Sequence, residues 1–379
     1  MYVRARDFWS HPRSSGGDTV NLGGDTPSTQ KRWVLQSGSS PPIFWSMKNL
    51  AKITITVIST LLVVLVVLIF VIAHFTLVFV LDTKVNGRIF PSEIQSSAPL
   101  MSHSAKQREW MLLTAKQRQI LSQDNLILNA YFIAAPEATN CYVILCHGYK
   151  NSALSMAEYA FVYHQAGWNV LVPDHRSHGY SQGRYITMGW KEHQDLILWA
   201  NSVIDQNPHA QILLHGISMG AATVMMAAGS PELPPHVVAA VEDCGYTSLP
   251  DELEDKISLG LGLPAFPLVP VTSLLSRIQI GNFLGAVDCV EAVSHSKIPI
   301  LFIHGENDVF VPFWMLEELY VAATCPKIKL VVPRAAHAQS QGVNPQLYWS
   351  TVEFFINRFI PKNSPPSKQK LRPVSFDSK

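Results

Sequence analysis

Residues 211–228 constrain the fold of this chain more than any other segment. An apolar run at 211–215 has the composition of a buried strand, and the alanine-rich run at 221–228 favours a helix. The pentapeptide Gly216-Ile217-Ser218-Met219-Gly220 joins the two without space for a loop. So sharp a turn brings neighbouring backbone close to the serine, and a Cβ at Gly216 or Gly220 would clash. The pattern therefore predicts a strained turn that holds the Ser218 hydroxyl at the end of a strand.

Two further strand ends carry side chains that can act with Ser218. The apolar run 299–304 opens into a loop that contains Asp308, and the run 327–332 is followed by His337. The carboxyl ends of parallel strands meet at one edge of a sheet. The serine, the acid and the histidine are therefore predicted to converge on one point.

These three residue types suit nucleophilic catalysis. A serine hydroxyl is a weak nucleophile and needs a base to take its proton during attack. The imidazole of His337 titrates near neutral pH and can accept that proton and return it to a leaving group. Asp308 would hold the imidazole in the right tautomer and would remain ionised.

Other acidic and histidine side chains compete for these roles. Asp174 and Asp243 also follow apolar runs and are rival candidates for the acid, less well placed in chain order. His147 and His304 precede glycines at strand ends, where packing of the turn or support of the site is expected. Three histidines in the segment 175–193 lack matched carboxylate or cysteine spacing, so no metal site is predicted.

The chain resembles the α/β-hydrolases over roughly residues 119–360, because the order serine, acid, histidine is the order those enzymes use. The other motifs resemble the membrane-anchored "cell-surface hydrolase" group of Gram-positive bacteria. They are Cys146-His147-Gly148-Tyr149, Pro173-Asp174-His175-Arg176-Ser177-His178-Gly179, Glu242-Asp243-Cys244-Gly245-Tyr246 and His304-Gly305-Glu306-Asn307-Asp308. The resemblance implies an α/β-hydrolase fold, a mostly parallel twisted sheet with helices on both faces.

The resemblance also implies an oxyanion hole, two backbone donors that stabilise the tetrahedral oxygen formed by attack. One donor is the N–H of Met219, just after the nucleophile, and the other is the N–H of Tyr149, in the loop after an early strand. Removing one such donor typically costs about 3 kcal/mol in the transition state.

One segment is predicted to cross a membrane. Residues 53–81 contain no Asp, Glu, Lys or Arg over 29 positions, long enough to span a bilayer with some tilt. A cleavable signal peptide would have a shorter apolar run that ends in small residues. The low share of charged residues, 15%, agrees with an anchored protein.

Lysine and arginine are evenly divided close to that span, but the longer N-terminal side adds five more basic residues. The positive-inside rule therefore favours a single-pass protein of the cell membrane with its catalytic domain outside the cell. The five cysteines show no C-x-x-C spacing, and no essential disulfide is predicted. Five thiols fit an oxidising exterior poorly, which is an argument against this orientation.

The two ends of the chain are expected to be disordered. Residues 1–46 are rich in serine, glycine and proline without apolar periodicity, and the tail 361–379 is basic and proline-rich. Met47 followed by Lys48 and Lys52 resembles the start of a signal anchor, so translation from Met47 is an alternative hypothesis.

Residues 82–118 are interpreted as a linker and a helix, the helix at 105–118, and residues 119–360 as the catalytic domain. Within that domain apolar strands alternate with helices, which indicates parallel strands joined by right-handed crossovers. Residues 251–293 interrupt the alternation and are rich in Leu, Gly and Pro. We expect a cap over the site, suited to an apolar substrate group, although covering the sheet end is a simpler role.

These patterns predict a membrane-anchored serine hydrolase that cleaves small-molecule carboxylic esters or related acyl bonds. A net charge of +1 excludes binding of nucleic acid through a basic surface, and no pattern implies a cofactor. A peptidase of the prolyl-oligopeptidase type and an acyltransferase share the same residues. A hydrolase-fold binding protein without activity is the alternative from another class.

Overall fold

The computed structural model describes residues 43–87, 102–260, 262–360 and 371. Most of the two expected disordered ends, 1–46 and 361–379, lies outside the described residues. Residues 1–60 and 61–379 form two separate compact units, and each is described by itself. What is described of the first unit is the beginning of helix α1 (Ile43–Leu81). By length and composition, Met47–Leu81 could cross a membrane.

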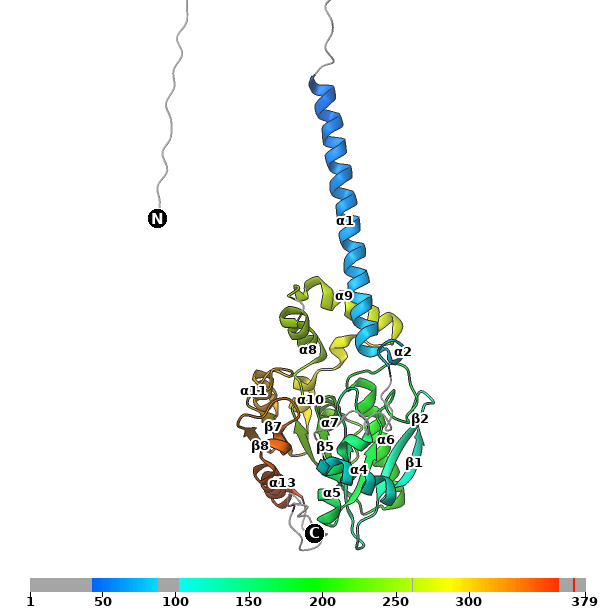
Figure 1. Ribbon diagram of the computed structural model, residues 1–379, viewed down its shortest axis with the longest axis vertical. Coiled ribbons are helices and arrows are strands. Elements are labelled where there is room, and N and C mark those ends of the chain that lie inside the picture. Colours follow the sequence, from blue (N-terminus) through cyan, green and yellow to red (C-terminus); the bar gives the residue numbers. More distant parts are fainter. Residues whose placement is uncertain (1–42, 88–101, 261, 361–370, 372–379) are drawn as a thin grey trace, which may run out of the picture. The chain divides into compact units, whose positions relative to one another are not determined.

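The second unit is built on an eight-stranded sheet in the order β1-β2-β4-β3-β5-β6-β7-β8 (Figure 1). The strands are β1 (Lys116–Leu121), β2 (Ile127–Ile133), β3 (Cys141–Cys146), β4 (Asn169–Pro173), β5 (Gln211–Ile217), β6 (Val237–Asp243), β7 (Ile300–Gly305) and β8 (Lys327–Val332). The first three strands of that order pair antiparallel, and every later pair is parallel. The central strands are apolar and buried along their length because helices cover both faces.

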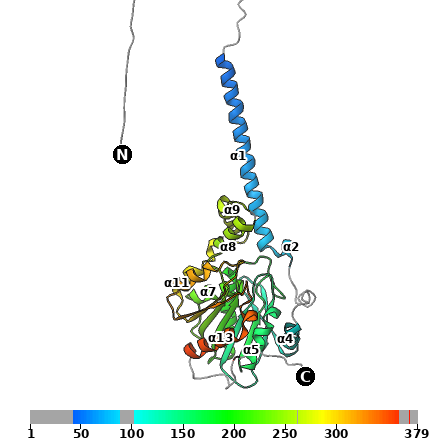
Figure 2. The same cartoon turned by 60° about the vertical axis from the view of Figure 1, so that its left-hand side comes forward.

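Helices lie on both faces of the sheet (Figures 1 and 2). One core cluster packs the sheet against α6 (Trp190–Gln206), α7 (Met219–Gly229), α10 (Cys289–His295) and α11 (Trp314–Ala322). The other packs it against α4 (Ser102–Thr114), α5 (Ala157–Gln165) and α13 (Pro345–Phe359). Three further short elements are α2 (Thr83–Asn86), η1 (Ala153–Met156) and α12 (Ser340–Val343).

The segment 251–293 consists mainly of helices. It takes in most of α8 (Leu249–Asp255), a π-helical turn η2 (Lys256–Gly260), α9 (Ala265–Gln279), a short turn η3 (Leu284–Ala286) and the start of α10. Helix α10 packs so closely on α7 that a Cβ at Gly229 would lie 2.2 Å from the Ala292 carbonyl oxygen. The end of the expected cap segment therefore belongs to the layer that covers the sheet.

One helix boundary expected from the sequence is wrong. The helix expected at 105–118 ends at Thr114, and strand β1 begins at Lys116. Residues 116–121 pair in antiparallel register with Ile127–Phe132 of β2, around the turn at Asp124 and Asn125. Their lysine, glutamine and arginine side chains favour a helix locally, but pairing at the edge of the sheet outweighs that preference.

The register brings successive strand ends side by side. Cys146 pairs with Gly216, Ile217 with Asp243, and Gly305 with Val332. The loops that follow β3, β5, β6, β7 and β8 therefore leave the sheet at one edge, where the candidate site residues lie.

Candidate active site

Ser218 sits on a strained turn between β5 and α7. Its backbone has φ 57° and ψ −119°, a conformation that non-glycine residues rarely adopt. A Cβ at Gly216 would lie 2.1 Å from the Gly220 carbonyl oxygen, and a Cβ at Gly220 would lie 2.1 Å from the Cys146 carbonyl oxygen. Both glycines are therefore required by the close approach of backbone, as the sequence predicted.

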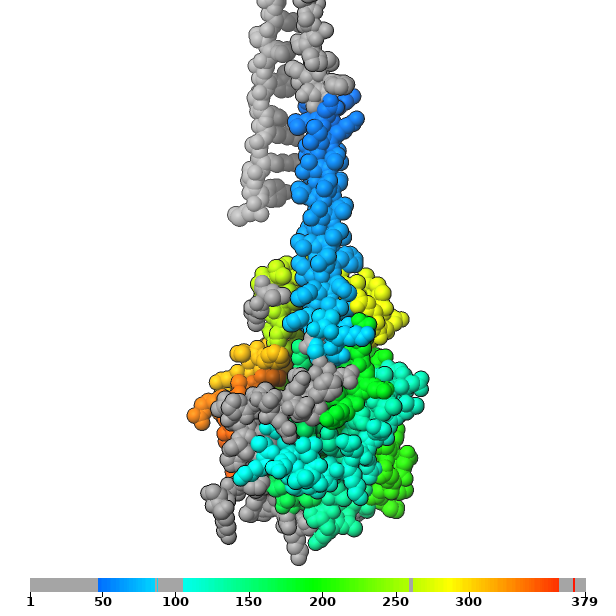
Figure 3. All heavy atoms as spheres, turned by 45° about the vertical axis from the view of Figure 1, so that its right-hand side comes forward, coloured from blue at the N-terminus to red at the C-terminus, as the bar shows by residue number. Residues whose placement is uncertain are grey.

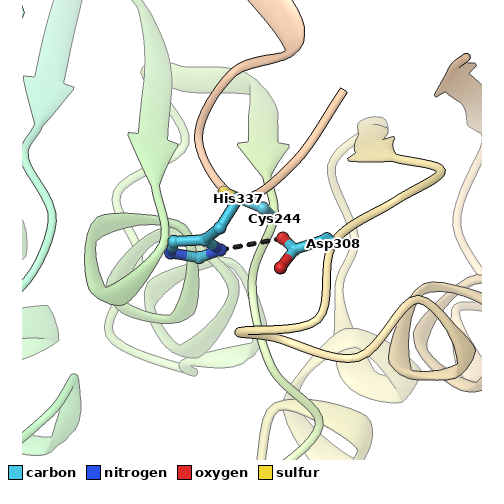
Figure 4. Close-up of side chains that lie close together, drawn as sticks. All are labelled: Cys244, Asp308 and His337. Atoms are coloured by element: carbon cyan, nitrogen blue, oxygen red, sulfur yellow. Dashed lines mark hydrogen bonds and ion pairs between the residues drawn. The ribbon is translucent and has the colours of Figure 1, made fainter. Parts of the chain in front are cut away.

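The structure brings Ser218, His337 and Asp308 together. The distance between His337 Nε2 and Ser218 Oγ is 2.9 Å. His337 Nδ1 lies 2.8 Å from Asp308 Oδ2, and Figure 4 shows these two side chains facing each other. The Asp308 side chain is fully buried, whereas 21% of the His337 side chain is exposed. The histidine is therefore open to a substrate while the acid is not.

Hydrogen bonds keep the Asp308 carboxylate ionised. The backbone N–H groups of Phe310 and Val311 each donate to Oδ1 at 2.9 Å, and His304 Nε2 lies 3.4 Å from Oδ2. Burial alone would raise the pKa of Asp308, but the bonds with His304 and His337 dominate and hold that pKa well below its usual range. An ionised Asp308 accepts a proton-bearing Nδ1, which leaves the Nε2 of a neutral His337 free to accept the serine proton.

The rival acids have other partners. Asp174 accepts hydrogen bonds from the backbone N–H groups of Ala153 and Tyr180, at 2.8 Å and 3.0 Å. Asp243 is buried, which raises its pKa to about 6, and its carbonyl oxygen accepts the Ser218 N–H at 2.8 Å. Neither carboxylate bonds to His337 within the described residues. Asp243 therefore supports the turn through its backbone.

The loop 147–149 passes beside the serine. A Cβ at Gly148 would lie 3.4 Å from Ser218 Cβ. Burial keeps the pKa of His147 well below its usual value, so a neutral ring accepts the His175 N–H through Nε2 at 3.1 Å. His178 Nε2 similarly accepts the N–H of Lys150 at 3.2 Å. These histidines shape the loop.

The predicted oxyanion donors lie on these two elements. Met219 is the first residue of α7, where a backbone N–H has no acceptor within its own helix. Tyr149 is in the loop that runs beside Ser218, and its hydroxyl donates to the Val80 carbonyl oxygen at 2.6 Å. The donor roles of the Met219 and Tyr149 N–H groups remain predictions.

Two neighbours of the site were not singled out from the sequence. The Phe310 ring lies 4.7 Å from the His337 ring, centroid to centroid. Cys244, at a backbone φ of 53°, places its sulfur within 4.8 Å of ligand atoms of Asp308 and His337 (Figure 4). Burial raises the pKa of this thiol well above its usual value, and a neutral thiol is a poor metal ligand. Their positions depend on turns after β6 and β7 that no sequence pattern specifies.

The chain is similar to known proteins in sequence and in structure. Residues 137–250 match the family described as Serine aminopeptidase, S33. The uncharacterized protein YqkD of Bacillus subtilis is 29% identical over 224 residues, which cover 59% of this chain and 73% of that protein. An uncharacterized membrane protein of Saccharomyces cerevisiae is 24% identical over 242 residues, 62% of this chain and 78% of that protein. The structure of a Pyrococcus furiosus esterase matches with a TM-score of 0.55 and 25% identity, covering 67% of this chain and 96% of that chain.

Proposed function

Because the chain belongs to the α/β-hydrolase superfamily, we propose that it is a serine hydrolase that cleaves carboxylic esters through an acyl-enzyme on Ser218. The observation that carries the proposal is the continuous pair of hydrogen bonds from Ser218 Oγ through His337 to Asp308. The similarity to a Pyrococcus furiosus esterase supports ester cleavage.

The geometry supports a two-step reaction. His337 Nε2 takes the hydroxyl proton as Ser218 Oγ attacks the acyl carbon, and the carbonyl oxygen becomes negatively charged. Collapse of this intermediate expels the alcohol, which takes the proton from His337 and leaves the acyl group on Ser218. His337 then takes a proton from a water molecule that attacks the acyl carbon. The bond to Ser218 Oγ breaks, Oγ takes the proton from His337, and the carboxylic acid is released. Asp308 stays ionised and stabilises the imidazolium in both steps.

A peptidase is the nearest alternative, and the match to a family described as Serine aminopeptidase is in its favour. Recognition of a peptide N-terminus would need a carboxylate available to an amine. The Glu252 carboxylate, on α8, interacts electrostatically with His337, but it is mostly buried, and burial raises its pKa to about 7. Lys256 Nζ lies 3.4 Å from its carboxylate. Because the Glu252 carboxylate is already paired with Lys256, it is not available to a substrate amine. We therefore favour ester cleavage over peptide cleavage.

We further propose that α1 anchors the enzyme in the cell membrane with the catalytic domain outside. The apolar segment Met47–Leu81 and the likeness to a yeast membrane protein support the anchor. All five cysteines are buried as free thiols, which protects them from oxidation in either compartment. The basic N-terminal segment and the resemblance to a membrane-anchored hydrolase group support the orientation.

Ester hydrolysis by the full chain in detergent micelles tests the proposal. Wild type, Ser218→Ala and His337→Ala would be compared on p-nitrophenyl esters of increasing acyl length. Ser294→Ala and His295→Ala, at a half-buried and an exposed position at the end of α10, are matched controls. We expect both site variants to lose at least about 1,000-fold in kcat and both controls to keep wild-type rates. A folded wild type that cleaves none of the esters would favour a binding protein.

A further inference from the structure

The last turns of α1 belong to the catalytic unit. Residues 47–68 are all exposed, and burial begins at Ile69. From there, wholly or partly buried side chains recur at helical spacing on one face of the helix. They are Ile69, Ile72, Ala73, Thr76, Leu77, Val78, Val80 and Leu81. This face packs on the core of the catalytic unit, as Figure 3 shows for the lower part of the helix.

Polar contacts fix the end of α1 to the catalytic unit. Asp82 is fully buried and accepts the Arg184 guanidinium, with Nη2 at 2.7 Å. Burial opposes ionisation of Asp82, but the bond with Arg184 outweighs it and lowers its pKa. The Ile186 N–H donates to the Leu81 carbonyl oxygen at 2.9 Å. The helix end is therefore held in one position relative to the sheet.

The same helix end bonds to the loop beside the nucleophile. The Tyr149 hydroxyl donates to the Val80 carbonyl oxygen, and the neighbouring Gly148 passes beside Ser218. Ser218 is thus connected to the end of α1 through one loop. The level of this helix end relative to a bilayer depends on the number of α1 residues that precede it.

The number of residues needed to cross a bilayer can be counted along α1 from the sequence. A hydrocarbon core of about 30 Å needs about 20 helical residues. Counted from Ile53, the first residue after Lys52, these end at Ile72, one turn after packing begins at Ile69. Val80 follows eight residues later, about 12 Å further along the axis. The catalytic unit therefore meets the helix at the level of the lipid headgroups.

Helix α9 lies at this same level. Its last residue, Gln279, makes a 3.0 Å hydrogen bond through Nε2 with His74 Nδ1 of α1. Large apolar side chains on and just after α9 are exposed, and we call them the cap patch. They are Phe266, Leu274, Ile278 and Phe283. Single exposed apolar residues are ordinary, but four on one short segment beside a membrane span need a covering surface.

Two cationic side chains, one within α9 and one just after α1, fit a lipid surface. Arg277 lies between Leu274 and Phe283 in sequence and is exposed, with its guanidinium 5.9 Å from the Phe283 ring centroid. Lys84 is exposed just beyond the end of α1. Basic side chains among apolar ones suit the boundary between acyl chains and phosphate groups. A second copy of the chain would not need these charges.

We propose that the cap patch rests in the interfacial layer of the bilayer that α1 spans, and that the enzyme takes acyl ester lipids from that surface. The inference rests on the proposed function, because it names the substrate class of the same Ser218 site. The membrane presents the substrate on the edge of the sheet where the catalytic loops lie. Phe310, whose ring lies beside that of His337, and its exposed neighbour Val309 provide an apolar approach for an acyl chain.

Contact with lipid is tested directly by fluorescence quenching. The full chain would be reconstituted in phosphatidylcholine and phosphatidylglycerol nanodiscs with a bimane label at Ile278→Cys. Phe354→Cys, on α13, is the matched control, since Ile278 and Phe354 are 70% and 61% exposed. The native cysteines are buried and leave little background. Lipids brominated on their acyl chains should quench the label at position 278 and leave the one at 354 unchanged.

Equal quenching at both positions, or none at either, would overturn the proposal. Cross-linking of Ile278→Cys between two copies without quenching would also overturn it.

Activity provides a second measurement, the rate on a fluorogenic acyl phospholipid in the nanodisc divided by the rate on p-nitrophenyl butyrate. Ile278→Asp should lower this ratio at least about tenfold, the effect of losing burial of one isoleucine. Phe354→Asp should not change it. A wild type that cleaves neither substrate yet shows quenching at 278 would refute the proposed function and leave the membrane contact standing.

Discussion

Replacing Asp308 with asparagine should abolish activity with little change in shape. Oδ1 of the asparagine can still accept the two backbone N–H groups of Phe310 and Val311, which lie 2.9 Å away in the native chain. The amide nitrogen then faces His337 Nδ1, where Oδ2 now lies at 2.8 Å. Two donors cannot bond, so the ring takes the tautomer with its proton on Nε2. That nitrogen can no longer accept the proton of Ser218.

The loss in kcat should be about 10⁴-fold, the effect of this tautomer reversal in another Ser-His-Asp triad, or about 5.5 kcal/mol. Initial rates on p-nitrophenyl acetate by the full chain would measure it, with circular dichroism to show that Asp308→Asn is folded. Asp243→Asn is the control, because Asp243 contacts the turn through its backbone. If Asp308→Asn stays within about tenfold of wild type while Asp243→Asn is inactive, the assignment of the acid is wrong.

Two further predictions concern folding. Gly220→Ala should lower the free energy of unfolding by at least about 2 kcal/mol, because its Cβ would lie 2.1 Å from the Cys146 carbonyl oxygen. Gly342→Ala, with no atom within 4 Å, should not lower it. Urea titrations would compare them, and equal midpoints would contradict the packing argument. Burial raises the pKa of Glu242 to about 8, from about 4.3 in an unfolded chain. Between these values the folded chain holds the extra proton, so stability should fall by up to about 1.4 kcal/mol per pH unit as pH rises. Asp243 and Glu252, with pKa values raised to about 6 and about 7, contribute at lower pH, so Glu242→Gln should remove the slope chiefly between about pH 7 and pH 8. An unchanged slope in that range would show that the Glu242 carboxyl is not its source.

Local sequence patterns were enough to predict the parallel sheet and most of its elements. The strand at Lys327–Val332 has the predicted bounds, because the local apolar pattern there agrees with the final packing. The start of β1 could not be predicted, since residues 116–121 become a strand through pairing with β2. Local preference and tertiary pairing conflict at that edge.

The candidate site divides in the same way. Ser218, Asp308 and His337 could be chosen because each follows a strand, and parallel strands bring their carboxyl ends to one edge. Phe310 and Cys244 could not, because the turn after each strand decides which side chain faces His337. The packing of α1 could not be predicted from the sequence for another reason. Its buried stripe lies within an apolar run, where every residue fits a lipid environment equally well.

Covalent labelling tests the central claim most directly. The full chain in detergent micelles would be treated with a fluorophosphonate, digested and examined by mass spectrometry. An activated Ser218 predicts one adduct, on the peptide that contains residue 218, which disappears in Ser218→Ala and in His337→Ala. The Ser294→Ala variant should be labelled as fast as wild type. An adduct on a different residue, or none on a folded wild-type chain, would contradict the account.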